Sequence, residues 1–353
     1  MDNSKQYRAL VLDRAQHTEI QMMTPRTLSE GEVRIKLGAA GICGTDLHYY
    51  AAYANSGFEI QSPLTLGHEA SGTVSELGPN VVGFEIGDKV AINPVVACGH
   101  CLPCRRGQAN LCENKRFPGS ATTIPHIHGF FREYFEYPAS ACIKVDPKTS
   151  LEELAFVEPL SCSMHAIERA GNLLGRKVLV SGAGPIGVLA AACAKAAGAA
   201  SVTCTDLSDD TLAIAAQMGA DECINVANHP EQLQRYFEGN GQFDVVVEAS
   251  GALPALDNAL SAVRRGGTIV LLSNLPAGKV EIRANMIMLK ELNFLGTMQF
   301  GLEFEKALSL ILNRQVDVRP MLSAQFDLAD AQQAFELAKD RQRSMKVQLV
   351  SNK

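Results

Sequence analysis

Three short stretches of the chain carry side chains that bind metal ions. Cys43 stands in GICGTDLHYY, His68 and Glu69 are adjacent in LGHEASG, and Glu158 precedes a proline in FVEPLSCSMHA. A thiolate, an imidazole and a carboxylate form a ligand set that zinc accepts, and three protein ligands leave one coordination position open for chemistry. We therefore expect Cys43, His68 and Glu69 to hold a catalytic zinc directly. Glu158 is expected to bind it either directly or through the metal's water.

The adjacent pair His68 and Glu69 reaches one metal only if the backbone bends, because neighbouring side chains of a regular strand point to opposite faces. Gly67, just before the pair, permits such a bend. Pro159 fits the first turn of a helix and so places Glu158 near the N-cap. The alternative for each residue alone is structural, since an isolated cysteine is usually a small core residue.

A second, denser group of cysteines follows the spacing Cys98-x-x-Cys101-x-x-Cys104-x7-Cys112. Four thiolates at these intervals can close a tetrahedron around zinc and leave no open position, which is typical of a structural site. An iron–sulfur cluster would use a similar spacing. A zinc knuckle that binds nucleic acid is disfavoured by the net charge of −6.

A glycine-rich turn follows the apolar run Lys177–Ser181 and precedes an alanine-rich stretch. The turn consists of Gly182, Ala183, Gly184, Pro185, Ile186 and Gly187. In a dinucleotide-binding turn the first glycine permits the tight bend, the second lets the pyrophosphate approach the backbone, and the third packs the helix closely. The helix N-terminus then offers N–H groups to the phosphates. These residues predict a dinucleotide site, and the alternative is a glycine-rich turn in a fold that binds none.

Asp206 follows the next predicted strand. Its separation from the glycine turn along the sequence is about that at which a carboxylate accepts a hydrogen bond from the adenosine ribose in dinucleotide-binding motifs. Leu207 and Ser208 follow it, and no arginine or lysine stands beside it to balance a 2′-phosphate. The sequence therefore favours NAD over NADP.

The elements that must position these residues change in kind near residue 151. Before it the pattern predicts short strands: Ala9–Leu12, Glu32–Ala39, Gly72–Leu77, Lys89–Ile92 and Phe130–Glu136. After it strands and helices alternate, which predicts a parallel sheet covered on both faces. The expected helices are Val188–Ala197, Leu212–Met218, His229–Phe237, Ala255–Val263, Glu303–Asn313 and Leu328–Asp340. The expected strands are Lys177–Ser181, Ser201–Thr205, Glu222–Asn225, Val245–Ala249, Thr268–Leu272, Asn293–Thr297 and Lys346–Val350.

Composition fits an ordinary two-domain enzyme. The 353 residues are 46% hydrophobic and 20% charged, and the net charge argues against a nucleic-acid partner. No apolar run is long enough to span a bilayer, and the first residues lack the apolar core of a signal peptide. We expect a cytoplasmic protein with no membrane partner.

The motifs together resemble those of the zinc-dependent medium-chain alcohol dehydrogenases, and within that family the sorbitol dehydrogenase branch. The resemblance covers nearly the whole chain and is carried by GICGTDLHYY, LGHEASG, the cysteine group, RFPGSATTIPHIHGFFREY, EPLSCSMHA and SGAGPIG. It implies an α/β protein with a GroES-like, β-rich catalytic domain over residues 1–155, including the structural zinc lobe 98–112. A Rossmann domain is expected over residues 156–295, and residues 296–353 are expected to return to the catalytic domain. The resemblance also implies a homo-oligomer, either a tetramer or a dimer.

The resemblance implies hydride transfer between NAD(H) and a secondary alcohol of a small polyol or sugar acid such as L-idonate. Sorbitol, xylitol and threonine are alternative substrates within the same branch. A non-catalytic dinucleotide-binding protein on this fold is the alternative of a different class, and the presence of the metal-binding residues argues against it. Thr45 is expected to accept the proton of the substrate hydroxyl and His48 to carry it onward. The alternatives are a helix-capping hydroxyl and a polar surface residue.

For the substrate, the resemblance implies contacts from Tyr49, Phe117 and Glu158. His126 and His128 stand two residues apart and would share one face of an extended segment, where they line the pocket, bind a second metal or serve only as loop residues.

Gln299, in LNFLGTMQFG, departs from the branch, which has arginine in the corresponding segment. A neutral amide there removes a natural partner for a substrate carboxylate, unless Lys115, Arg116 or His128 supplies one.

Overall fold

The computed structural model describes residues 6–351, which form two compact units. Within that range the first unit runs to Glu158 and also contains Leu322–Asp340 and the strand that begins at Lys346. The second unit comprises Pro159–Met321 and Arg341–Met345. The compact units therefore divide after residues 158 and 321, and residues 296–321 cluster with the second unit, whereas the expected domains divide after residues 155 and 295.

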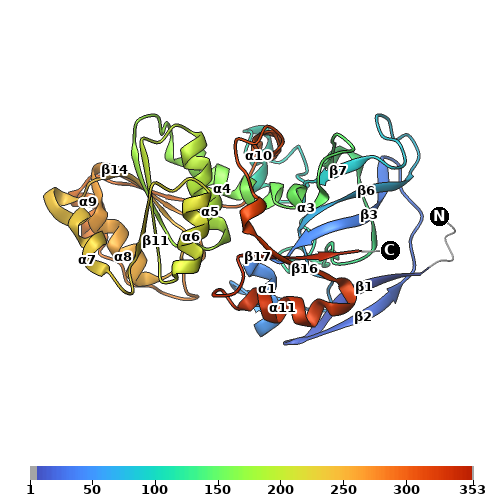
Figure 1. Ribbon diagram of the computed structural model, residues 1–353. Helices are drawn as coiled ribbons and strands as arrows, with labels where there is room; N and C mark the ends of the chain where they lie inside the picture. The colour runs from blue at the N-terminus through green and yellow to red at the C-terminus, as the bar shows by residue number, and fades with distance from the viewer. Residues whose placement is uncertain (1–5, 352–353) are drawn as a thin grey trace. The chain divides into compact units, whose positions relative to one another are not determined.

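The first unit is built on a seven-stranded sheet with the order β16-β17-β3-β6-β7-β9, and β8 pairs with β3 outside this path. Its strands are β1 (Tyr7–Arg14), β2 (His17–Met23), β3 (Glu32–Gly41), β4 (Ala54–Asn55), β5 (Phe58–Glu59), β6 (Glu69–Leu77), β7 (Lys89–Ile92), β8 (Tyr134–Pro138), β9 (Cys142–Lys144), β16 (Leu322–Asp327) and β17 (Lys346–Val350). Its helices are α1 (Gly44–Ala52), α2 (Leu102–Arg105), α3 (Leu151–Leu154) and α11 (Ala331–Lys339). β17 pairs in parallel with β16 and antiparallel with β3, so the end of the chain completes the sheet (Figure 1).

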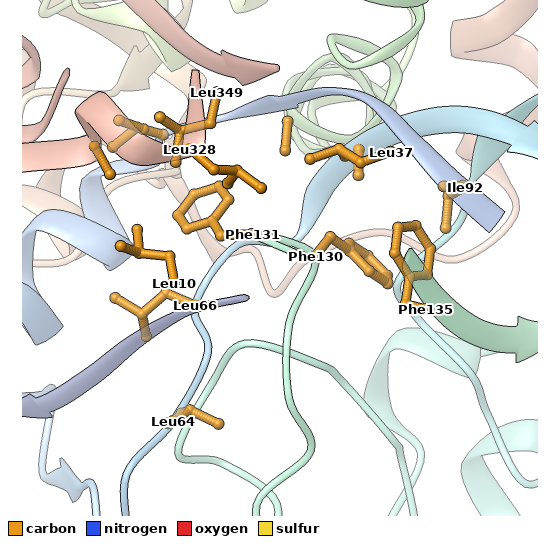
Figure 2. Packing of buried hydrophobic residues seen from close by; sticks show 14 of the residues in the cluster. Leu10, Leu37, Leu64, Leu66, Ile92, Phe130, Phe131, Phe135, Leu328 and Leu349 are labelled. Carbon is orange, nitrogen blue, oxygen red and sulfur yellow. The ribbon is translucent and has the colours of Figure 1, made fainter. Parts of the chain in front are cut away.

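The core of the first unit lies on this sheet and is rich in phenylalanine. Phe130, Phe131 and Phe135 are fully buried and come from one short segment. Figure 2 shows Phe130 beside Phe135, with their ring centroids 4.7 Å apart, and Phe131 among leucines that include Leu328 and Leu349. Burial of such side chains contributes about 1.5–3 kcal/mol each, so this core is the main support of the elements that carry the metal-binding residues.

The second unit is a parallel six-stranded sheet with the order β12-β11-β10-β13-β14-β15. Its strands are β10 (Lys177–Ser181), β11 (Ser201–Asp206), β12 (Glu222–Asn225), β13 (Phe243–Glu248), β14 (Val263–Leu271) and β15 (Asn293–Gly296). Its helices are α4 (Val157–Ala170), which begins at the unit boundary, α5 (Pro185–Ala196), α6 (Asp209–Gln217), α7 (Pro230–Gln234), α8 (Leu253–Ala262), α9 (Ala284–Leu289) and α10 (Glu303–Leu312). The strand order reverses between β10 and β13, which is the Rossmann arrangement and places a ligand crevice at the carboxyl ends of these strands.

The predicted βαβ unit is confirmed, and its largest difference from the prediction is at the start of its helix. α5 begins at Pro185, one turn before the expected start at Val188, and Gly184 is its N-cap. Proline suits the first helical position because its missing N–H has no partner there in any helix. Gly198 follows the end of α5 with φ +86°, as expected of a residue that ends a helix.

One predicted strand is shorter than expected. Phe130–Glu136 predicts a strand, but β8 begins only at Tyr134. The N–H groups of Phe130 and Phe131 donate to the carbonyls of Gly67 and Leu66, so this part of the segment follows the loop before β6, and the Phe131 carbonyl accepts the Leu10 N–H of β1 at 2.8 Å. Within residues 6–351, no helix combines the length and the apolar character needed to cross a bilayer.

Candidate metal centre and cofactor site

The first unit brings Cys43, His68 and Glu69 together. Cys43 is the N-cap of α1, His68 precedes β6, and Glu69 is the first residue of β6. One ligand atom from each of the three lies within 4.8 Å of the others. The bend expected at Gly67 is present, because that residue has φ +92°. It lets two adjacent side chains face one point.

Asp46 holds the backbone around these ligands and was not expected from the sequence. It lies at the third position of α1 and is fully buried. Its Oδ2 accepts the Cys43 N–H at 2.9 Å, and its Oδ1 accepts the Gly67 N–H at 3.2 Å. Burial raises the pKa of Asp46. The Cys-x-x-Asp spacing is that of a capping box with cysteine at the N-cap, and this spacing is the sequence feature from which the role of Asp46 could have been predicted.

His68 is buried, and its Nδ1 has no hydrogen-bond partner among the described residues. The nearest carboxylate oxygen, Oδ1 of Asp46, is 3.7 Å from Nδ1. Burial lowers the pKa of His68, but Asp46 and Cys43 oppose it and hold the pKa well above its usual value. Buried polar atoms are rarely left unpaired. An unpaired imidazole nitrogen beside a thiol and several carboxylates therefore fits a site for a cation.

Glu69 is held by Lys346, a second residue that sequence reasoning missed. The Nζ of Lys346 is 2.9 and 2.7 Å from the two carboxylate oxygens, and the exposed fractions of the two residues are 1% and 4%. A side chain on Gly41 would collide with Oε2 of Glu69. The glycine on β3 and the lysine on β17 thus fix this carboxylate from both sides. A single lysine at the start of a predicted strand carries no sequence signal for such a role.

Glu158 lies close to the same cluster but outside the group of three. It is the second residue of α4 and is 5% exposed. Its charge contributes to the raised pKa of both His68 and Lys346. The donor set of thiol, imidazole and carboxylates matches the preferences of zinc.

The residues expected to move the proton lie directly after Cys43. Thr45 is half-buried and His48 is exposed, and both are on α1. Residues three apart share one side of a helix. A hydroxyl near the cluster is thereby followed by an imidazole that reaches solvent.

The aromatic residues expected to contact substrate differ in position. Phe117 is buried with its ring centroid 5.2 Å from that of His68, so it lines the metal-binding cluster. Tyr49 is also buried, and its hydroxyl accepts the Ala121 N–H at 3.1 Å and lies 3.3 Å from Oγ of Ser120. Tyr49 therefore attaches α1 to the loop after Phe117.

The two histidines of that loop bond to backbone groups. Nε2 of His126 accepts the Gln61 N–H at 2.8 Å, and Nδ1 of His128 accepts the Thr65 N–H at 3.1 Å. Burial, followed by the charge of Arg132, lowers the pKa of His128. They are not in a shared cluster of metal-binding side chains among the described residues.

Gln299 lies just after β15 in the second unit. It is half-buried and has φ +50°, a left-handed conformation that is uncommon outside glycine.

The four cysteines of the second motif also meet. One sulfur from each of Cys98, Cys101, Cys104 and Cys112 lies within 4.8 Å of the others. The Cys98 N–H points to the sulfur of Cys112 at 3.2 Å. Backbone N–H groups, first that of His100, lower the pKa of Cys98 to about 6. Four converging sulfurs without a carboxylate fit a closed zinc site.

The glycine turn of the second unit has the steric properties of a dinucleotide site. Gly182 has φ +99°, and a Cβ there would lie 2.7 Å from the Ser250 nitrogen. A Cβ on Gly187 would collide with the Gly182 carbonyl. At Gly184 the same space is open, because among the described residues beyond its neighbours in the chain only Nη1 of Arg341 comes within 4 Å, at 3.6 Å. The turn therefore leaves room at its middle glycine, where the motif needs a close approach.

Asp206 stands at the carboxyl end of β11, beside this turn. Its Oδ2 accepts the Ala183 N–H at 2.6 Å, and its Oδ1 accepts the N–H groups of Leu207 at 2.7 Å and Ser208 at 3.1 Å. A carboxylate has about four acceptor positions, so these three bonds leave it able to accept one more.

Comparisons with known proteins agree with this geometry. Residues 29–147 match the alcohol dehydrogenase GroES-like domain, and residues 185–313 match the zinc-binding dehydrogenase family. The chain is 35% identical to the L-idonate 5-dehydrogenase (NAD(P)(+)) of Escherichia coli K12 over 316 residues, which cover 90% of this chain and 91% of that protein. It is 31% identical to the sorbitol dehydrogenase of Bacillus subtilis strain 168 over 333 residues, 94% of this chain and 93% of that one.

Solved structures lead to the same family. The L-idonate 5-dehydrogenase of Escherichia coli has a TM-score of 0.93 at 33% identity, with 98% of each chain covered. An alcohol dehydrogenase from Escherichia coli CFT073, complexed with NADH, has a TM-score of 0.89 at 26% identity and covers 98% of this chain and 100% of that one. The chain belongs to the zinc-binding alcohol dehydrogenase family, and the protein is an oxidoreductase. Zinc and a nicotinamide dinucleotide are the typical cofactors of this family, and the predicted combination of a GroES-like and a Rossmann domain is confirmed.

Proposed function

We propose that this protein transfers a hydride between NAD(H) and a secondary alcohol of a sugar acid or polyol, with zinc held by Cys43, His68 and Glu69. The observation that carries the proposal is the convergence of these three side chains within 4.8 Å, in a chain that also has an open glycine turn. The relatives named for L-idonate and sorbitol support the substrate class.

Zinc bound at this cluster would lower the pKa of a coordinated hydroxyl and polarise a carbonyl oxygen. The chain's own residues then have distinct tasks. Thr45 accepts the hydroxyl proton of the substrate, and a bound nicotinamide would supply the acceptor for the hydride. His48, which is exposed, passes that proton to solvent. Phe117 covers one side of the His68 ring and keeps water from it.

Asp46 and Lys346 position the ligands. Asp46 fixes the backbone on both sides of the site, at Cys43 and at Gly67. Lys346 holds Glu69 in one orientation, and Glu158 is the carboxylate available to bind the ion directly or through its water.

The metal assignment is tested by measuring bound zinc in Cys43→Ser and in Cys223→Ser. Cys223 is a matched control because it is half-buried in the second unit and its thiol points to the Leu212 carbonyl at 3.3 Å. Loss of one zinc and of activity in Cys43→Ser alone is expected. Full zinc content in Cys43→Ser would reject the assignment.

The substrate is tested by a spectrophotometric comparison of L-idonate, sorbitol, xylitol and threonine, each with NAD and with NADP. We expect L-idonate with NAD to give the highest kcat/KM. A clear preference for one of the polyols or for threonine would assign the protein to that alternative. Absence of any reduced cofactor with all four would favour the non-catalytic alternative. Because Gln299 is neutral, variants of Arg116 and His128 test whether either supplies the partner of the idonate carboxylate.

We also propose that the protein acts in the cytoplasm as a homo-oligomer, a tetramer or a dimer. All ten cysteines are free thiols, which suits a reducing compartment. β15 ends its sheet as an edge strand, and α9 beside it exposes Met288 and Leu289 at 70% and 67%. Such edges are usually covered in native proteins, and a second copy would cover this one. Light scattering compares the molar mass of Met288→Glu with that of the wild type. A lower mass is expected, and an unchanged mass would show that this edge does not form the interface.

A further inference from the structure

One short stretch of the C-terminal segment belongs to the cofactor-binding unit. α11 before it and β17 after it are parts of the first unit, whereas Arg341–Met345 clusters with the second unit. The stretch contains Arg341 and Arg343. This stretch therefore adds two positive charges to the second unit, whose glycine turn contains no positively charged residue.

Arg341 lies at the glycine turn. Its Nη1 is 3.6 Å from the position that a Cβ on Gly184 would take. Gly184 is the N-cap of α5, and the next residue, Pro185, contributes no N–H. The guanidinium of Arg341 is thus at the N-terminus of a twelve-residue helix, above the one glycine of the turn that has open space.

No residue of the described chain, 6–351, accepts a hydrogen bond from the Arg341 guanidinium or forms an ion pair with it. The nearest acid of the motif, Asp206, is already engaged by three backbone N–H groups. The N-terminus of a helix is itself positive, and a second positive charge beside it is unfavourable unless an anion lies between them. Arg341 is exposed, so its guanidinium is free to receive an anionic ligand at the turn.

We propose that Arg341 binds the pyrophosphate of the dinucleotide as a charged donor that the glycine motif does not contain. The inference rests on the proposed function, since it assumes that the cofactor lies on this turn. A guanidinium offers two parallel N–H groups to phosphate oxygens, and such bonds are about twice as strong as neutral ones. Its position at Gly184, the glycine where the motif lets the pyrophosphate approach the backbone, assigns Arg341 to the pyrophosphate.

The test compares Arg341→Gln, Arg341→Lys and Arg343→Gln with wild type. NADH binding is followed by the fluorescence of the reduced nicotinamide, which is convenient because the chain has no tryptophan. ADP-ribose and adenosine serve as competitors, since both carry the adenine and ribose but only the first carries a pyrophosphate. Zinc content and the melting temperature are measured in parallel, because Lys346 of the metal-binding cluster follows this stretch directly.

We expect Arg341→Gln to weaken NADH and ADP-ribose by about tenfold or more, the effect of one lost charged hydrogen bond. Adenosine affinity, zinc content and melting temperature stay at wild-type values. Arg341→Lys recovers part of the loss, and the binding of NADH by Arg341→Gln depends less on salt. Arg343→Gln removes the same charge from the same stretch and leaves the NADH affinity within about twofold.

Two results would overturn the inference. Unchanged NADH affinity in Arg341→Gln would do so, and so would equal losses in Arg341→Gln and Arg343→Gln, which indicate only the net charge of the stretch. Failure of the wild type to bind NADH would instead reject the proposed function. Loss of adenosine affinity together with that of NADH would show that the turn itself was damaged, and would also count against a specific pyrophosphate contact.

Discussion

Replacement of Lys346 by methionine tests whether Glu69 faces a metal ion. The lysine forms two contacts with the carboxylate, at 2.9 and 2.7 Å, inside the first unit. Methionine keeps the length of the side chain but leaves Glu69 buried without a partner. Removal of one member of a buried ion pair costs about 3–5 kcal/mol. We therefore expect metal-free Lys346→Met to lose about this much free energy of unfolding.

Zinc changes the expected cost. A divalent ion that is bound by Glu69 compensates the buried carboxylate, so the loss in the zinc-loaded protein falls to about 1–3 kcal/mol. The difference of about 2 kcal/mol between the two forms must appear as tighter zinc binding by the variant, by roughly 30-fold, because folding and binding are linked. The difference between the two losses of unfolding free energy and the change in zinc affinity are thus two independent measurements of the coupling between Lys346 and the bound zinc.

Urea unfolding followed by tyrosine fluorescence is the suitable assay. All the tyrosines except Tyr236 belong to the first unit, and the chain has no tryptophan, so the signal reports the unit that contains the pair. Lys144→Met is the matched control: it breaks the ion pair with Asp88 at 2.8 Å on the surface of the same unit and should shift the transition only slightly in either form. Equal losses with and without zinc in Lys346→Met would refute a metal-bound Glu69. A loss as small as that of the control would refute the buried pair itself.

Four further outcomes are expected. Thr45→Val should lower turnover by about 100-fold and flatten its pH dependence, and full turnover at all pH values would reject the proton relay. Asp206→Ser should raise the ratio of kcat/KM for NADP over that for NAD by about tenfold, and an unchanged ratio would remove Asp206 from cofactor selection. Cys101→Ser should lose the zinc of the cysteine group, measured by metal analysis, while Cys43 keeps its own. Burial raises the pKa of Glu303, but hydrogen bonds from His165 and from the Gly301 N–H outweigh burial and lower the pKa. The stability that comes from a lowered carboxyl pKa is lost as the pH falls through that pKa, so Glu303→Gln should cost about 1 kcal/mol of unfolding free energy at neutral pH and nothing at low pH. A loss that stays constant with pH in thermal melts would contradict this.

Local patterns predicted the second unit well because its strands are continuous apolar runs and its helices alternate with them. β10 and β12 have the predicted bounds, and the largest difference in the βαβ unit is the first turn of α5. α1 was not expected, because it is short and its buried face includes a carboxylate, Asp46. The strand predicted from Phe130 failed in its first half, since the N–H groups of Phe130 and Phe131 donate to the loop before β6 and not to a neighbouring strand.

The candidate site shows the same limit. Cys43, His68 and Glu69 were identified by their side-chain chemistry, and the bend between strand and loop was predicted from Gly67. Lys346 was not, because its role depends on where β17 joins the sheet, and a lysine that begins a strand has no distinguishing neighbour in the sequence. Long-range pairing of this kind is set by tertiary structure, which local propensity does not contain.

The place of β17 between β16 and β3 has a consequence for how the protein is made. Synthesis proceeds from the N-terminus, so β17 leaves the ribosome after both of its neighbours in the sheet and after the second unit. The second unit has nearly all of its residues by then and is free to fold earlier, whereas the first must wait with the edge of β3 unpaired. A chain that stops short of Lys346 lacks both the closing strand and the cation beneath Glu69, so truncated products are exposed to proteolysis before they can hold a metal.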